Sequence, residues 1–156
     1  MMSPRFLVAG AVGLWIASIV VAQDGSTDVL RYPVAVVAAQ KATTNDGVYT
    51  KKQADDAKAQ FDKICADCHP FTVAGKKKVK DVPLGEDPFY DNWTGRPLAD
   101  MISTIVLTMP NDGSAVVTDE EAANLVAYIL QQNGFKAGDT ALSKANATAV
   151  VERPRK

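Results

Sequence analysis

Three segments of the chain repeat apolar residues at the spacing of an α-helix. They span residues 50–65, 97–108 and 118–132. Their apolar positions are, in chain order, Ala54, Ala57, Phe61 and Ile64; Leu98, Met101, Ile102 and Ile105; and Ala122, Leu125, Val126 and Ile129. This pattern predicts three helices that each bury one apolar stripe.

The ends of these segments carry helix-capping residues. Residues 50–53 and 118–121 fit the capping box, in which a threonine hydroxyl and the side chain three positions later satisfy free backbone donors. Pro97 suits the first position of a helix, and Asn133-Gly134 suits the end of one. The helix boundaries are therefore predicted from the chemistry of their ends as well as from periodicity.

The segments between and around the helices have loop composition. Residues 70–92 combine proline, glycine and a lysine-rich run, which excludes a long helix. Residues 23–48 are predicted to be an extended leader, and residues 138–156 a flexible tail. No strand-length alternation of apolar and polar residues occurs. The sequence predicts an all-α domain over residues 49–137, with three main helices and long loops.

The N-terminal residues 1–22 have the pattern of a secretory signal peptide. A basic start containing Arg5 is followed by sixteen uncharged residues and the small residue Ala22. A retained membrane anchor is the alternative, because about 17 apolar residues can span a bilayer. Both interpretations predict export, so we expect a periplasmic protein that is either free or membrane-anchored.

The amino-acid composition argues against one class of function, nucleic-acid binding, and the positions of the cysteines and the histidine indicate another. The 156 residues have a formal net charge of −1, so no excess of cations is present to neutralise nucleic-acid phosphates. The chain has two cysteines and one histidine, and all three lie within five residues. This concentration of ligand-type side chains is the main functional signal.

The sequence from Cys65 to His69 reads C-x-x-C-H, the pattern of covalent haem attachment. A structural zinc site would need four cysteine or histidine ligands, and the chain has three. A catalytic zinc with three protein ligands is not excluded by count, but no supporting motif is present. A thioredoxin-type motif would need a βαβ setting, and a simple disulfide gives His69 no role. The pattern predicts one haem c.

The haem iron would need a ligand opposite His69, and the chain has no second histidine. Met101 lies on an apolar helical stripe, where methionine usually fills the core. Met109 follows that helix and precedes Pro110, so a loop could turn its sulfur inward. Met109 is the favoured candidate; Met101, a lysine and an open position remain alternatives.

The residues from Cys65 to His69, the interval to Met109-Pro110 and the closing helix together resemble the class I, single-haem cytochrome c family. Residues 93–100 and 128–134 are similar to bacterial members associated with periplasmic dehydrogenases. The resemblance covers residues 46–137. It implies the cytochrome c fold, wrapped around one covalently bound haem c.

The resemblance also implies residue roles. Cys65 and Cys68 would form thioether bonds to the haem, and His69 and Met109 would be the axial iron ligands. Pro83 resembles the proline whose carbonyl accepts a hydrogen bond from the far nitrogen of the ligating histidine, which fixes the ring orientation.

Four further positions resemble family residues. Trp93 and Arg96 are similar to residues near the haem propionates, although packing and a solvated charge would explain them equally well. Phe61 and Tyr128 resemble the aromatic pair at the crossing of the first and last helices.

Two positions depart from the family pattern. Pro70 stands where a glycine usually follows the haem histidine, which restricts the backbone of His69. Ala57 stands where a glycine commonly lets the terminal helices approach closely. We expect a changed loop exit and a wider helix crossing, with haem binding intact.

These features predict an electron carrier without enzymatic activity. It would pass single electrons from a periplasmic dehydrogenase to a terminal oxidase or reductase. The alternatives are a dedicated haem subunit of a dehydrogenase complex, and a ligand-binding or sensor haem protein with an open iron position. The run from Lys76 to Lys80 could contact an acidic partner, or could be a solvated loop.

Overall fold

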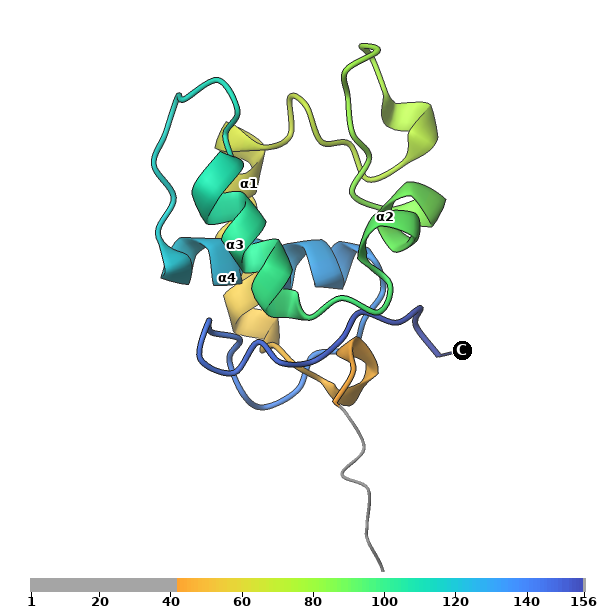
Figure 1. Ribbon diagram of the computed structural model, residues 1–156, viewed down its shortest axis with the longest axis vertical. Coiled ribbons are helices and arrows are strands. Elements are labelled where there is room, and N and C mark those ends of the chain that lie inside the picture. Colours follow the sequence, from red (N-terminus) through yellow and green to blue (C-terminus); the bar gives the residue numbers. More distant parts are fainter. Residues whose placement is uncertain (1–41, 156) are drawn as a thin grey trace, which may run out of the picture. The chain divides into compact units, whose positions relative to one another are not determined.

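The computed structural model describes residues 42–155, and these residues form an all-α fold (Figure 1). The α-helices are α1 (Lys51–Ile64), α2 (Glu86–Trp93), α3 (Leu98–Thr108) and α4 (Asp119–Gln132). Two short 3-10 helices are η1 (Thr44–Asp46) and η2 (Val73–Gly75). Residues 42–155 contain isolated β-bridges and no strand. The predicted fold class is confirmed.

The predicted signal peptide and most of the predicted leader lie outside the described residues. Within residues 42–155, no helix is long and apolar enough to cross a membrane.

Helices α1 and α4 pack against each other and form the centre of the core. Phe61 of α1 and Tyr128 of α4 place their ring centroids 5.1 Å apart, as expected for the predicted aromatic pair. Ala57 is buried in the same layer. Helix α3 packs on α4 through its stripe of buried residues, which includes Leu98 and Ile102. The periodic apolar positions therefore face the core as predicted.

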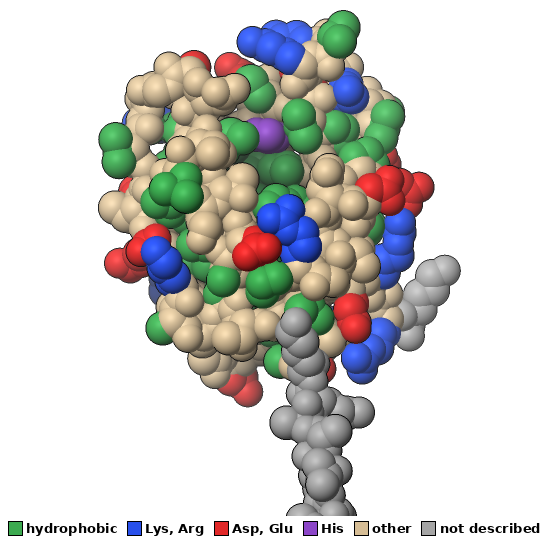
Figure 2. Space-filling model, viewed as in Figure 1, with side chains coloured by type: hydrophobic (Ala, Val, Ile, Leu, Met, Phe, Trp, Pro, Cys, Tyr) green, Lys and Arg blue, Asp and Glu red, His purple; other side chains and the backbone are tan. Residues whose placement is uncertain are grey.

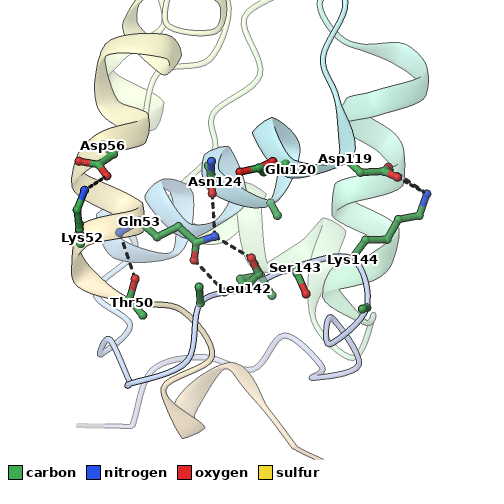
Figure 3. A pocket seen from close by; sticks show the side chains of 13 residues that line it. Thr50, Lys52, Gln53, Asp56, Asp119, Glu120, Asn124, Leu142, Ser143 and Lys144 are labelled. Atoms are coloured by element: carbon green, nitrogen blue, oxygen red, sulfur yellow. Dashed lines mark hydrogen bonds and ion pairs between the residues drawn. The ribbon is translucent and has the colours of Figure 1, made fainter.

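The two predicted capping boxes have different outcomes. At α4 both halves form: Thr118 Oγ1 accepts from the Glu121 N–H, and the Glu121 carboxylate accepts from the Thr118 N–H at 2.8 Å. At α1 only the Thr50 hydroxyl takes part, at 3.2 Å from the Gln53 N–H. The Gln53 side chain instead bonds the C-terminal segment (Figure 3).

The prediction that residues 70–92 are entirely loop is wrong for their last third. Helix α2 begins after Gly85, with Glu86 and Asp87 in its first turn, and it buries Phe89 and Tyr90. Acidic residues favour the start of a helix. Eight residues contain too few turns for periodicity to reveal the helix.

The prediction of a flexible tail is also wrong, because residues 139–153, here named the C-terminal strap, pack on the domain. Its buried residues are Leu142, Ala147, Ala149, Val150 and Val151. The strap pairs with the end of the predicted leader, where Thr43 and Thr44 are buried and Thr43 bridges to Val150. The domain therefore extends beyond the predicted 49–137 at both ends. Backbone hydrogen bonds at Ala147, Ala149, Val150 and Val151 hold the strap in place, and a hydropathy pattern does not report such bonds.

Candidate haem site

A cavity of about 730 Å³ opens between the ends of α1 and α3. Figure 2 shows the imidazole of the chain's one histidine inside a hollow with hydrophobic side chains around it. The cavity is lined by apolar side chains from all sides, among them Phe61, Ile64, Val82, Leu84, Ile105, Val117, Leu125 and Ile129. Binding sites for organic cofactors are apolar clefts of about 300–1,000 Å³. The volume and the lining fit a large apolar cofactor.

The end of α1 brings the two cysteines and His69 to this cavity. Cys65 is the C-cap of α1, and a tight turn follows, in which the N–H groups of Cys68 and His69 donate to the Cys65 carbonyl at 3.1 and 3.0 Å. All three side chains line the cavity, and both cysteines are free thiols. Cys65 is partly buried and Cys68 is exposed. Burial raises the pKa of the Cys65 thiol to about 11, so the thiol is protonated at neutral pH.

The orientation of His69 corrects the prediction for Pro83 by one residue. The carbonyl of Val82, rather than that of Pro83, lies 2.9 Å from Nδ1 of His69. Two backbone bonds set this register: the Val82 N–H donates to the Cys68 carbonyl at 2.9 Å, and the Leu84 N–H donates to the Pro70 carbonyl at 2.8 Å. A carbonyl can only accept, so Nδ1 is the donor, and in a neutral ring the lone pair that can bind a metal is on Nε2.

Val82 is thus a site residue that the sequence reasoning missed. A family proline marks the loop that supplies the carbonyl, but the pairing register decides which residue in that loop faces His69. No periodic signal in the sequence reports that register.

Asp81 anchors the loop that precedes Val82. Its side chain is 4% exposed, and its Oδ2 accepts from the N–H groups of Lys77 and Lys78, each at 2.8 Å. These bonds, first that from Lys77, hold the pKa of Asp81 below its usual range. The aspartate folds residues 76–80, here named the lysine loop, into a turn at the cavity rim, where Lys80 lines the opening.

The end of α3 brings Met109 to the cavity. Met109 is the C-cap of α3, its N–H donates to the Ile105 carbonyl at 3.0 Å, and its side chain is partly buried. Met101 also lines the cavity, but it is 2% exposed within the α3 core face. The structure therefore brings both candidate methionines and His69 to one cavity. Of the two methionines, Met109 lies at the end of a helix and is followed by a loop, whereas Met101 lies within the helix.

Trp93 and Arg96 stand together at the cavity wall. The Arg96 guanidinium lies 4.5 Å from the centre of the Trp93 ring, and its Nε is 3.3 Å from the Asp100 carboxylate. A cation over an aromatic face is held by the ring quadrupole. The pair places a guanidinium at the cavity wall, as expected for a contact to an anionic edge of a cofactor.

The donor set of the cavity fits haem c better than a protein-bound zinc ion. A covalently attached iron porphyrin requires two thiols, an imidazole, a thioether and a wide apolar wall. Residues 42–155 contain no group of three His, Cys, Asp or Glu side chains placed to hold a metal ion. The spacing that predicted haem attachment and the shape of the cavity lead to the same cofactor.

The chain matches a protein-family model. Residues 52–129, half of the chain, match the family described as cytochrome c oxidase, cbb3-type, subunit III. The matched segment runs from α1 into α4 and includes Cys65, Cys68, His69 and Met109. The searches of curated proteins and of solved structures returned no match.

The volume of the cavity predicts that the fold depends on its cofactor. Without the cofactor, the apolar side chains that line the cavity, such as Phe61, Leu125 and Ile129, lack packing partners there and face water. We expect the Cys65→Ala, Cys68→Ala double variant, prepared without haem, to show no cooperative thermal unfolding transition in circular dichroism. The wild-type holoprotein is the control. A native-like melt of the haem-free variant would contradict this expectation.

Proposed function

Because the chain belongs to the cytochrome c family of the cbb3-type subunit III model, we propose that it is an exported single-haem carrier of electrons. The cytochrome c domain identifies the chain as an electron-transfer haem protein. The observation that carries the finer proposal is that both cysteine thiols, His69 and Met109 line the same cavity. We further propose that residues 1–22 direct export, which would make the protein periplasmic.

In this proposal Cys65 and Cys68 anchor one haem c, and His69 and Met109 are its axial ligands. The haem would supply one-electron redox chemistry at its iron. The Val82 carbonyl orients the His69 ring by accepting from Nδ1, which leaves Nε2 as the nitrogen for the iron. Asp81 holds the backbone that carries Val82 in place.

The cavity wall supports a carrier with a raised reduction potential. Methionine opposite histidine favours ferrous iron, and the apolar residues of α3 and α4 disfavour added positive charge at the centre. Arg96 lines the cavity wall beside Trp93, where its guanidinium would offset an anionic group of the haem.

The same arrangement argues for a carrier over an enzyme. With His69 on one side and Met109 on the other, both axial positions would be taken, so no substrate could reach the iron. The remaining chemistry is electron transfer through the edge of the cofactor. We propose that its partners are an exported dehydrogenase as donor and a terminal oxidase or reductase as acceptor.

A second function is favoured by the description of the matching family, which names a subunit of a larger enzyme. On this alternative the domain would be a dedicated haem subunit that stays bound to a catalytic partner.

Purification of the natively expressed protein separates these functions. We expect a periplasmic, monomeric protein with one added haem mass and a chain that begins after Ala22. Co-elution with a larger dehydrogenase or oxidase subunit would favour the subunit function. A product of polypeptide mass alone would contradict both.

Substitution of each methionine distinguishes the iron ligand. Leucine conserves volume and removes sulfur, so we expect Met109→Leu to abolish the weak long-wavelength absorption band that ferric haem shows with a methionine ligand. The reduced variant should also bind carbon monoxide rapidly. Met101→Leu is the matched control and should keep the band. Loss of the band in Met101→Leu alone would assign the ligand to Met101.

The lysine loop is proposed as the docking surface for an acidic partner, because it lies beside the cavity opening and Val79 at its tip is fully exposed. We expect replacement of Lys76, Lys77, Lys78 and Lys80 by glutamine to slow oxidation of the reduced protein by anionic ferricyanide about tenfold at low salt. Oxidation by a cationic cobalt complex should become faster. Stopped-flow measurements at low and high salt check both rates.

The matched control replaces four exposed lysines outside the lysine loop by glutamine: Lys51, Lys52, Lys58 and Lys144, each of which pairs with an aspartate. It makes the same change in net charge away from the lysine loop and should leave both rates nearly unchanged. Equal effects of the two sets of substitutions would refute docking at the lysine loop.

A further inference from the structure

Helix α3 lacks a capping side chain at its N-terminus, and the C-terminal strap takes over this role. The N-cap residue is Pro97, whose side chain makes no capping bond. The first two N–H groups of α3, those of Leu98 and Ala99, donate to the carbonyls of Ala149 and Ala147, each at 2.9 Å. Free N–H groups at a helix start need such partners. The strap therefore fixes where α3 begins.

The strap also holds the turn before α3. The Gly95 N–H donates to the Val151 carbonyl at 2.8 Å, and the Val151 N–H donates to the Arg96 carbonyl at 2.9 Å. Val151 is fully buried. Because Trp93 and Arg96 line the cavity, these two bonds connect the strap to the cavity wall.

The strap is anchored independently of α3 at several points. Val150 exchanges backbone bonds with the segment at Ala42 and Thr44, at 2.9 Å each. Arg153 lies over the Tyr90 ring of α2 at 4.3 Å and pairs with Asp87 at 2.6 Å.

A further anchor lies on α1. The Gln53 amide both donates to and accepts from the Leu142 backbone, at 2.7 and 2.8 Å (Figure 3). The strap is thus bonded to the segment from Ala42 to Thr44, to α2 and to α1. These bonds allow it to hold the start of α3 in a fixed position.

We propose that the C-terminal strap is a positioning element of the haem site, holding α3 so that Met109 at its far end reaches the axial position. This inference rests on the proposed function. Helix α3 has 11 residues and is about 16 Å long, so a shift at its start is carried to Met109 at its end. Figure 1 shows the strap at one end of α3 and the loop after Met109 at the other.

Loss of the strap should act on Met109 selectively. Cys65 and Cys68 would be covalently bound, and His69 is oriented by Val82; the strap forms none of these backbone bonds. Met109 depends on α3, whose other packing partner is α4. Methionine would also be the weaker of the two iron ligands, because a thioether sulfur is a poorer electron-pair donor than an imidazole nitrogen.

The experiment removes the strap after the holoprotein has folded. A protease site is inserted between Asp139 and Thr140, both of which are exposed. The purified full chain is cut, and the strap peptide is removed by size exclusion in mild urea followed by dialysis. An uncut sample passes through the same steps as the control. The long-wavelength methionine band, the rate of carbon monoxide binding and the reduction potential are measured on both.

We expect the cut protein to lose at least half of the methionine band, to bind carbon monoxide at least tenfold faster and to have a lower potential. The haem should stay attached with histidine bound. An unchanged band after removal of the strap overturns this inference and leaves the proposed function standing. Absence of the band in the uncut chain overturns Met109 ligation, and this inference with it.

Rescue in trans separates positioning from general loss of stability. A synthetic peptide of residues 140–155 should restore the band. The same peptide with Val151→Pro cannot donate to the Arg96 carbonyl and should fail to restore it. A peptide with Lys144→Ala, which removes only the exposed pair with Asp119, is the matched control and should restore it. Equal rescue by the Val151→Pro peptide would contradict a positioning role for Val151.

Discussion

The packing of α1 against α4 is the constraint on which the site depends, because it determines where the chain turns after α1. Phe61 sits at this contact: its ring stacks on Phe71, with centroids 5.0 Å apart, and lies 5.1 Å from the tilted ring of Tyr128. Phe71 lies two residues after His69. One aromatic cluster therefore fixes both the end of α1 and the loop that leaves the cysteine-histidine motif. This explains how the site tolerates Pro70: Phe71 anchors the chain immediately after it.

Much of the fold was predictable because its main helices bury regular stripes and end at capping residues. Leu98, Ile102, Leu125 and Val126 are buried as their spacing predicts. Helix α2 was not predicted, because its eight residues contain too few turns for the apolar pattern to repeat. The strap was not predicted, because backbone hydrogen bonds hold it in place. Whether these bonds form depends on the segments that the strap contacts and not on its own composition.

The site was predictable to the extent that its chemistry lies in consecutive residues. Cys65, Cys68 and His69 follow each other, so one motif identifies them, and Met109 is marked by the end of a helix. Val82 and Asp81 act through a backbone register between two loop segments. This register is set by hydrogen bonds between two segments that the fold brings together. The sequence shows both segments but not which residues of one pair with which residues of the other.

The segment that matches the family model ends before the strap begins. The match ends at residue 129, so it includes every predicted haem ligand but neither the strap nor the segment from Ala42 to Thr44 that anchors it. A helix that begins at an uncapped Pro97 still needs partners for its first N–H groups. In this chain, residues beyond the family domain supply them. The matched segment thus covers the predicted haem ligands and ends before the element that holds α3 at its start.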